Sequence, residues 1–241
     1  MLKQEQIDQF HRDGYLVVEN VLSQNELLSL RQQLETWVDE SREYTEAYGE
    51  TIDGRSRFDV DPVDHGADHP ALRRVSSPTE ISDVYFETAI HSNMAEMAGK
   101  LIGGSGTRFH HSKVNAKLPH TATTVKWHQD FPFTPHTNDD MITALLMVGE
   151  VTQDNGPLQV IPGSHKGELF NHWQEGRFTG KVEDAVEAEQ CQNYVSCVGS
   201  AGSVCFMHTR LLHASGANHT ALPRYLFITV YTAEDAVPLS D

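Results

Sequence analysis

The order of apolar and polar positions predicts a helix and then a strand at the start of the chain. Ile7 and Phe10 stand three residues apart within the segment Gln4–Asp13, and Gly14 follows as a helix stop. The next run, Tyr15–Leu22, is short and mostly apolar. That composition predicts a strand.

Two longer helical stretches are predicted after this strand. Ser23 and Glu26 match a capping box, in which the two side chains satisfy backbone N–H groups at a helix start. An apolar stripe at helical spacing continues from there to about Glu40. A second helical stretch is predicted from Ser77-Pro78 to about Leu101, before a pair of glycines.

The second half of the chain has the pattern of short strands. Seven apolar runs are bounded by Gly, Pro, Asn or Asp, at residues 109–118, 123–130, 141–151, 157–162, 195–198, 203–214 and 224–231. Strands without intervening helices indicate a sandwich or a jelly roll. We therefore expect a mainly β fold with flanking helices.

Two segments lack this regularity. Residues 44–80 predict a long loop or a set of irregular strands, and residues 167–193 form a polar, acidic insertion. Segments of this kind usually carry function. No linker marks a second domain, so we expect one domain over 1–241, with N-terminal helices of 1–104 packed on a barrel of 105–233.

The charge balance limits the partners. Lys and Arg number 18 against 34 Asp and Glu, which gives a formal net charge of −16 and disfavours nucleic acid and anionic membrane surfaces. No apolar run approaches the ~20 residues that span a bilayer, and the N-terminus has no signal-peptide core. The three cysteines match no zinc spacing. We expect a cytoplasmic monomer or homodimer that acts on a small molecule.

The most specific local feature is the segment Trp-His-Gln-Asp that ends at Asp130. On a strand, residues two apart point to the same face, so His128 and Asp130 can both reach one metal ion. A second His-x-Asp occurs at 11–13, and we interpret that copy as a solvated helix end. His128 differs because the β region that follows it supplies a further histidine and an arginine.

Two histidines and one carboxylate form the facial triad of non-haem Fe(II) oxygenases, which leaves three coordination positions open. His208 and His213 are the candidates for the third ligand. They are five residues apart, so on a regular strand only one of them can face inward. Arg224, further along, can bind a carboxylate through two parallel hydrogen bonds.

Three segments together resemble the phytanoyl-CoA dioxygenase family: WHQD at 127–130, NGPLQVIPGSHKG at 155–167 and LLHASGANHTALPR at 211–224. The similarity covers about residues 109–233, roughly half of the chain. Members of this family are Fe(II)- and 2-oxoglutarate-dependent oxygenases on a double-stranded β-helix, a form of jelly roll. The resemblance assigns iron to His128, Asp130 and His213, and the distal carboxylate of 2-oxoglutarate to Arg224 with the help of Ser215.

The resemblance also implies the reaction. With Fe(II), 2-oxoglutarate and O2, such an enzyme hydroxylates an unactivated C–H bond of an amino acid, a natural product or a related metabolite, and releases succinate and CO2. Two other classes stay open. One is a cupin-like metal-dependent isomerase or hydrolase, although cupins usually offer His-x-His and a glutamate. The other is a metal-binding jelly roll without catalysis, which would release no succinate.

A positive zone precedes the His-x-Asp motif. His111, Lys113 and Asn115 alternate along one predicted strand face, and residues 108–129 contain four Lys or Arg and no acid. Asn115 matches a 2-oxoglutarate-contacting position of the family, whereas His111 stands where family members often have glutamine. A positive zone suits a dianionic cosubstrate. We therefore predict that His111, Lys113 and Asn115 contact it.

The irregular segment 44–80 holds the densest group of arginines. Arg55, Arg57, Arg73 and Arg74 are candidate anchors for a substrate with an anionic group. The candidates for an apolar wall are Trp127, Phe131, Phe133 and Met147. The alternative is that these arginines pair with the many neighbouring aspartates and only fold the segment.

Overall fold

The structure is a computed structural model that describes residues 1–104, 106–120, 122 and 124–239. Ser105 and Thr123, where the barrel and one strand were expected to begin, lie outside the described residues, as do 240 and 241 at the end of the expected domain. The helices are α1 (Gln4–Asp13), α2 (Gln24–Ser41), α3 (Asp83–His91), α4 (Asn93–Ile102) and α5 (Asp184–Gln190), with 3-10 turns η1 (Pro78–Glu80), η2 (Phe131–Phe133) and η3 (Ser164–Lys166).

Two antiparallel sheets face each other and form a double-stranded β-helix. The large sheet has the order β1-β12-β7-β14-β5-β4-β3-β2, and the small sheet has the order β11-β8-β13-β6. The strands of the large sheet are β1 (Tyr15–Val18), β2 (Tyr48–Ile52), β3 (Arg55–Val60), β4 (Leu72–Ser76), β5 (Thr107–Lys117), β7 (Met141–Met147), β12 (Val204–His208) and β14 (Arg224–Ala233). Those of the small sheet are β6 (Val125–His128), β8 (Leu158–Val160), β11 (Val195–Cys197) and β13 (His213–Ser215), and β9 (Trp173–Gln174) pairs with β10 (Arg177–Phe178). The predicted mainly β fold with flanking helices is confirmed.

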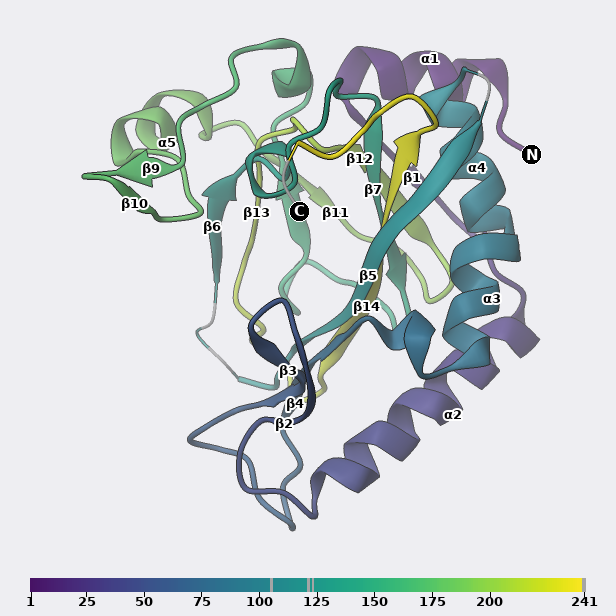
Figure 1. Cartoon of the computed structure of the whole chain (residues 1–241), viewed down its shortest axis with the longest axis vertical. Helices are drawn as coiled ribbons and strands as arrows, with labels where there is room; N and C mark the ends of the chain where they lie inside the picture. Colours follow the sequence, from purple (N-terminus) through teal and green to yellow (C-terminus); the bar gives the residue numbers. More distant parts are fainter. Residues whose placement is uncertain (105, 121, 123, 240–241) are drawn as a thin grey trace.

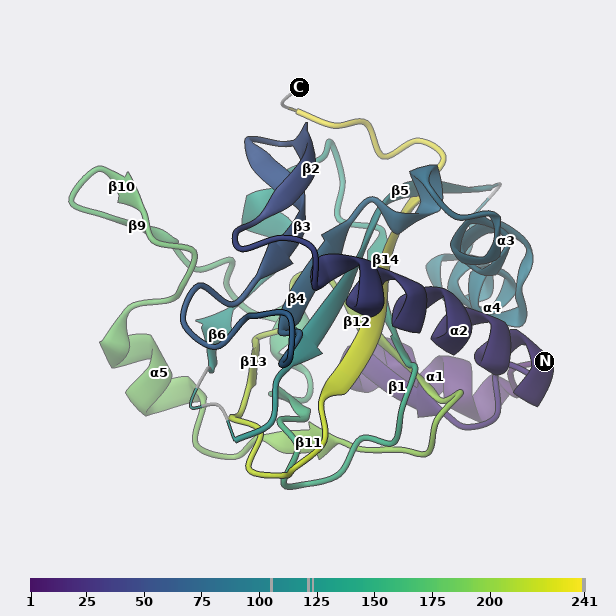
Figure 2. The same ribbon diagram turned by 90° about the horizontal axis from the view of Figure 1, so that it is seen from below.

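The helices cover one face of the large sheet. Helices α2, α3 and α4 lie along one side of the molecule, while β9, β10 and α5 project from the other side (Figures 1 and 2). Tyr85 of α3 packs its ring against Phe227 of β14 at 4.8 Å, and Tyr231 donates a hydrogen bond to the carbonyl of Ala89. The opposite face of the large sheet therefore remains for the interior of the barrel.

The predicted helix ends in the first 41 residues match the structure. Gly14 ends α1 in the left-handed conformation with φ 77°, which glycine adopts at little cost. Ser23 and Glu26 form the predicted capping box at the start of α2. The stretch expected as one helix from 77 to 101 is instead divided, because Ser92 is extended and its hydroxyl caps α4.

The structure also decides two expectations about strands, one for residues 44–80 and one for residues 203–214. Residues 44–80 form β2, β3 and β4, which extend the large sheet through β5. The expectation of one strand over 203–214 is wrong, because the chain turns after His208 and moves from β12 in the large sheet to β13 in the small sheet. Residues before 104 thus supply strands as well as helices, and the single-domain interpretation stays a prediction.

No helix in the described part of the chain has the length and apolarity that crossing a bilayer requires.

Candidate metal centre

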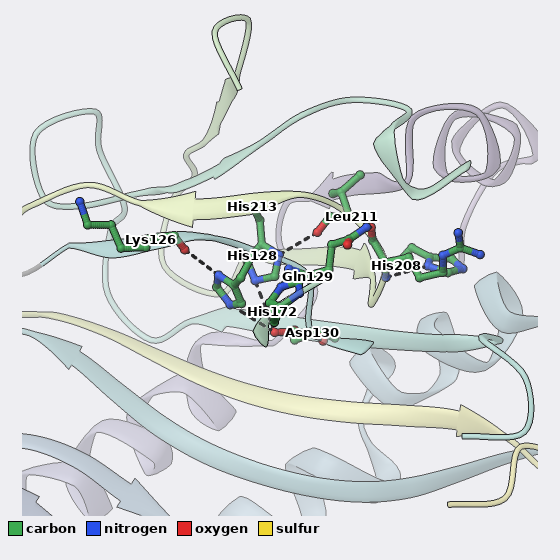
Figure 3. A network of polar contacts seen from close by, with 10 residues as sticks. Lys126, His128, Gln129, Asp130, His172, His208, Leu211 and His213 are labelled. Atoms are coloured by element: carbon green, nitrogen blue, oxygen red, sulfur yellow. Dashed lines mark hydrogen bonds and ion pairs between the residues drawn. The ribbon is translucent and has the colours of Figure 1, made fainter. Parts of the chain in front are cut away.

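Three predicted ligands converge between the two sheets. His128 ends β6 and His213 begins β13, and the two residues lie directly opposite each other in the register with ring centroids 4.0 Å apart. The Nε2 atoms of His128 and His213 lie 3.5 and 3.4 Å from Oδ1 of Asp130. The three side chains point toward one another (Figure 3). Among the described residues, this is the group of histidine, cysteine and acid side chains that can hold a metal ion.

Backbone carbonyls fix which nitrogen of each imidazole faces Asp130. Nδ1 of His128 lies 2.8 Å from the carbonyl oxygen of Lys126, and Nδ1 of His213 lies 2.9 Å from that of Leu211. A carbonyl oxygen only accepts, so both Nδ1 atoms donate. Each Nε2 then faces the carboxylate, where it donates to Asp130 when it carries a proton and offers a lone pair to a metal ion when it does not. Two lone pairs and a carboxylate around one point are a donor set that a bound divalent cation stabilises. The residues present therefore fit Fe(II).

Asp130 is held as an anion with one oxygen available. The Thr143 hydroxyl donates to Oδ2 of Asp130 at 2.8 Å, which leaves Oδ1 facing the histidines. Burial alone would raise the pKa of Asp130, but His213 and His128 outweigh it and hold the pKa well below its usual range. Burial, followed by the neighbouring His213, lowers the pKa of His128. Thr143 was not predicted, although a lone polar residue in the apolar run 141–148 is a signal that could have revealed it.

The structure corrects two expectations about how the three side chains meet. Asp130 does not lie on a strand, because β6 ends at His128 and Asp130 has helical backbone angles at the start of η2. It meets His128 through this turn and not through strand alternation. The parity comparison of His208 with His213 also assumed one regular strand. In fact His208 ends β12 and packs against His165 with ring centroids 5.2 Å apart.

A cavity of ≈ 540 Å³ opens beside the triad, between the inner faces of the two sheets. Arg224 lines one part of it and is only 4% exposed. Its Nη2 donates to the carbonyl of Gly156 at 2.9 Å, while its buried Nε has no hydrogen-bond partner among the described residues. Burial lowers the pKa of Arg224 to about 10, so the guanidinium is still charged at neutral pH. A buried cation with unused donors favours an anionic ligand.

The other predicted cosubstrate contacts also line this cavity. Ser215 and Asn115 face it, and Oδ1 of Asn115 accepts a hydrogen bond from Nε of Arg74 at 3.3 Å. His111 and Lys113 stand further along β5. Burial, together with the neighbouring Lys113, lowers the pKa of His111 to about 4, so that this imidazole is neutral at physiological pH.

The four arginines of segment 44–80 take different places. Arg57 is 4% exposed and forms ion pairs with Glu50 and Glu80, so its role is structural and it does not line the cavity. Arg55 is exposed at the start of β3. Arg73 and Arg74 both line the cavity.

Phe131 is not among the described residues that line the cavity. Its backbone N–H donates to the carbonyl of Thr209 at 3.0 Å, within the turn that carries Asp130. Phe133, which was predicted for the same apolar wall, does line the cavity, and its ring stands edge-on to His128 with centroids 5.7 Å apart. A continued strand would have placed these two aromatic residues on one face, whereas the 3-10 turn η2 brings Phe133 to the cavity without Phe131.

Gln129, between the candidate ligands His128 and Asp130, attaches the insertion 167–193 to the candidate metal centre. Its side chain is fully buried and donates to the carbonyls of Glu168 and Arg210 at 3.0 and 2.7 Å, while Oε1 accepts from the N–H of Phe170 at 2.9 Å. Its backbone N–H donates to Nε2 of His172 (Figure 3). Strand alternation turns the middle residue of His-Gln-Asp away from the metal, but nothing in the sequence shows that Glu168, Phe170 and His172 meet Gln129 there.

The Gln129→Leu variant is expected to lose about 3 kcal/mol or more of unfolding free energy. The substitution keeps the size of the side chain but leaves Glu168, Arg210 and Phe170 with unsatisfied backbone groups, at roughly 1–3 kcal/mol each. Urea denaturation followed by circular dichroism measures the loss. Gln32→Leu, on the exposed face of α2, is the matched control. Equal stability of the two variants would show that the hydrogen bonds of the Gln129 side chain do not stabilise the fold.

Comparison with known proteins agrees with this geometry. The family model for phytanoyl-CoA dioxygenase (PhyH) matches residues 10–225. A probable alpha-ketoglutarate-dependent hypophosphite dioxygenase of Stutzerimonas stutzeri is 33% identical over 175 residues, which cover 70% of this chain and 59% of that protein's own length. L-proline trans-4-hydroxylase of Streptomyces griseoviridis is 27% identical over 249 residues, covering 95% of this chain and 86% of the relative.

The fold is shared with a solved structure. EctD from S. alaskensis with bound Fe superposes with a TM-score of 0.77 at 24% identity, over 96% of this chain and 77% of that chain. At this identity the likeness supports the fold, here the double-stranded β-helix. The match of the family model over nearly the whole chain, together with the 33% identical relative, shows that the chain belongs to the phytanoyl-CoA dioxygenase family.

Proposed function

We propose that this protein is an Fe(II)- and 2-oxoglutarate-dependent dioxygenase that hydroxylates a small molecule and releases succinate and CO2. One observation carries the proposal. His128 and His213 bind backbone carbonyls through Nδ1 and direct Nε2 at Asp130, which is the donor set of the two-histidine, one-carboxylate iron site. Family membership supports the same conclusion.

In this proposal the side chains divide between iron and cosubstrate. His128, Asp130 and His213 hold Fe(II), while Arg224 and Ser215 hold the distal carboxylate of 2-oxoglutarate. Bound there, iron with 2-oxoglutarate supplies the oxidant that inserts one oxygen atom of O2 into the substrate, as 2-oxoglutarate becomes succinate and CO2.

The remaining task of the protein is to order the reactants and exclude water. Thr143 fixes the Asp130 carboxylate through one oxygen. Phe133 stands edge-on to His128, and a side chain at Gly180 would come within 3.0 Å of the Phe133 ring. Gly180 thus allows the insertion 167–193 to close against this aromatic wall. We propose that Phe133 and Gly180 shield the metal centre on the side of the insertion.

The relatives indicate the size of the substrate and leave its identity open. Their names specify hypophosphite, ectoine and L-proline, all of them small molecules. A cavity of ≈ 540 Å³ that also holds 2-oxoglutarate is suited to a substrate of that size. The acidic net charge further supports a protein without nucleic-acid or membrane partners, which we propose acts in the cytoplasm as a monomer or homodimer.

Anaerobic titration with Fe(II) and 2-oxoglutarate tests the proposal. We expect a visible charge-transfer band that needs both components, followed by succinate formation when O2 is admitted. Removal of metal with a chelator should abolish both signals, and Fe(II) should restore them. A cupin-like isomerase or hydrolase would show no such band with 2-oxoglutarate. A non-catalytic metal-binding jelly roll would show the band but release no succinate.

A further inference from the structure

The side chains that line the cavity carry more positive charge than is needed to balance the net charge of Fe(II), Asp130 and 2-oxoglutarate. The charged residues that line it, within the described part of the chain, are the cations Arg73, Arg74, Lys113, Lys117 and Arg224 and the acids Asp59 and Asp130. Arg73 pairs with Asp59 at 3.0 Å. Fe(II), the Asp130 carboxylate and the 2-oxoglutarate dianion together carry one net negative charge. With Lys117 left out of the count, Arg74, Lys113 and Arg224 still outnumber this single negative charge, so the complete site has an excess of cations.

The strand register separates these cations into two places. Arg224 pairs with Lys117 across β14 and β5, at the end of the cavity where the distal carboxylate of 2-oxoglutarate is proposed to bind. Lys113 lies four residues further along β5, or about 13 Å away at the usual rise of an antiparallel strand. Arg74 stands on β4 opposite Asn115, midway in the register between Lys113 and Lys117. Its charge acts on Lys113, whose pKa it helps to lower, and we therefore group these two cations.

Arg74 and Lys113 have no carboxylate within ion-pair distance in the described part of the chain. Arg74 uses Nε on Asn115, and no described residue accepts a hydrogen bond from its terminal nitrogens. Burial, and then the repulsion from Arg55, lowers the pKa of Arg74. Burial also lowers the pKa of Lys113, although the attraction of Asp130 opposes the shift. Two cations held close together without an anion are costly, and a bound anion removes that cost.

We propose that Arg74 and Lys113 form an anion-binding subsite beside the metal centre, and that the substrate is a small molecule carrying a carboxylate or another oxyanion. The inference rests on the proposed function, because it takes the Arg224 end of the cavity as the 2-oxoglutarate site. It reassigns Lys113, which was predicted to contact 2-oxoglutarate, to the substrate. Asn115 becomes a positioning residue that fixes the guanidinium of Arg74.

Calorimetric titration of the anaerobic Fe(II) and 2-oxoglutarate complex tests the subsite. The probes are hypophosphite, L-proline and L-prolinamide, of which the last lacks the carboxylate. Hypophosphite and L-proline each carry an oxyanion group, although L-proline as a whole is a zwitterion, and we call these two the anionic probes. We expect them to bind the unmodified protein at least tenfold more tightly than the amide. Arg74→Gln and Lys113→Gln should each weaken the anionic probes by about 30-fold or more, because each leaves the anion with one cation fewer in a buried site. Arg12→Gln makes the same change of charge at the surface and should have no effect.

A parallel titration of the charge-transfer band measures 2-oxoglutarate binding in each variant. We expect its affinity to change less than about threefold. The subsite would be overturned if the anionic probes bound no more tightly than the amide. It would also be overturned if their affinity were unchanged in both the Arg74→Gln and the Lys113→Gln variant. Variants that weaken the binding of 2-oxoglutarate instead of the probes would overturn it as well, because the two residues would then serve the cosubstrate. Arg74→Lys and Lys113→Arg keep the charge and should bind the probes more tightly than the glutamine variants, which excludes a folding defect as the cause.

The two proposals can fail separately. A protein that shows no charge-transfer band, yet binds hypophosphite through Arg74 and Lys113, retains the anion subsite while the dioxygenase assignment fails. A protein that forms the band and releases succinate, but binds the anionic probes equally well with and without Arg74, retains the dioxygenase assignment while the subsite fails.

Discussion

The Asp130→Ala variant is expected to lose more than about 100-fold of its succinate formation from 2-oxoglutarate. Changes to residues that merely orient metal ligands already cost 10–100-fold, so removal of a ligand must cost more. The carboxylate is the anionic member of the proposed donor set, and Oδ1 is the atom that both histidines face. Without it, two neutral imidazoles would have to hold a divalent cation alone.

Succinate release with saturating Fe(II), together with the charge-transfer band, measures the Asp130→Ala effect. Asp13→Ala is the matched control, since residues 11–13 repeat the His-x-Asp pattern at the end of α1, away from the cavity. Thermal unfolding should show that both variants are folded. Succinate production by Asp130→Ala at the level of Asp13→Ala would refute the triad.

The Arg224→Ala variant is expected to raise the KM for 2-oxoglutarate by roughly 30- to 1000-fold, since a lost charge-assisted contact in a buried site costs about 2–4 kcal/mol. Arg224 is nearly fully buried, and the Gly156 carbonyl is the one acceptor that the described residues give it. Its other donors thus remain for the cosubstrate. The kcat should change less, because the distal carboxylate lies away from the reacting bond.

Arg224→Lys separates charge from geometry. A lysine keeps the positive charge but cannot make two parallel hydrogen bonds to a carboxylate, so an intermediate KM is expected. Steady-state kinetics with 2-oxoglutarate as the varied substrate provide the measurement. If the KM stays unchanged in Arg224→Ala, the distal carboxylate binds elsewhere. Lys117, which pairs with Arg224 across the strands, is then the next residue to test.

The sequence was informative where the structure depends on neighbours along the chain. The capping box at Ser23 and the left-handed Gly14 are local devices, and both ends appear where they were expected. The resemblance that brought His128, Asp130 and His213 together rests on motifs in a fixed order. Such an order can be recognised without knowing how the strands pair.

The sequence was less informative where tertiary contacts decide. Arg57 and Arg74 have the same chemistry and lie in the same segment, yet Glu50 and Glu80 neutralise the first and no described carboxylate pairs with the second. Only the tertiary structure reveals this difference, since the pairing of β4 with β5 sets Arg74 opposite Asn115 while Arg57 meets two glutamates. The break in the predicted strand 203–214 likewise depends on tertiary contacts, because its first part pairs in the large sheet as β12 and its last part pairs in the small sheet as β13.

The position of His128 and His213 makes stability depend on metal supply. β6 is four residues long and lies at the edge of the small sheet, where β13 is its one partner strand in the described structure. An ion bound by both histidines would cross-link these two strands in the folded state alone. By mass action, iron at 100 times its dissociation constant would add about 2.7 kcal/mol to the free energy of unfolding. The melting temperature should therefore rise with iron concentration, and a cell short of iron would contain a less stable form of this protein.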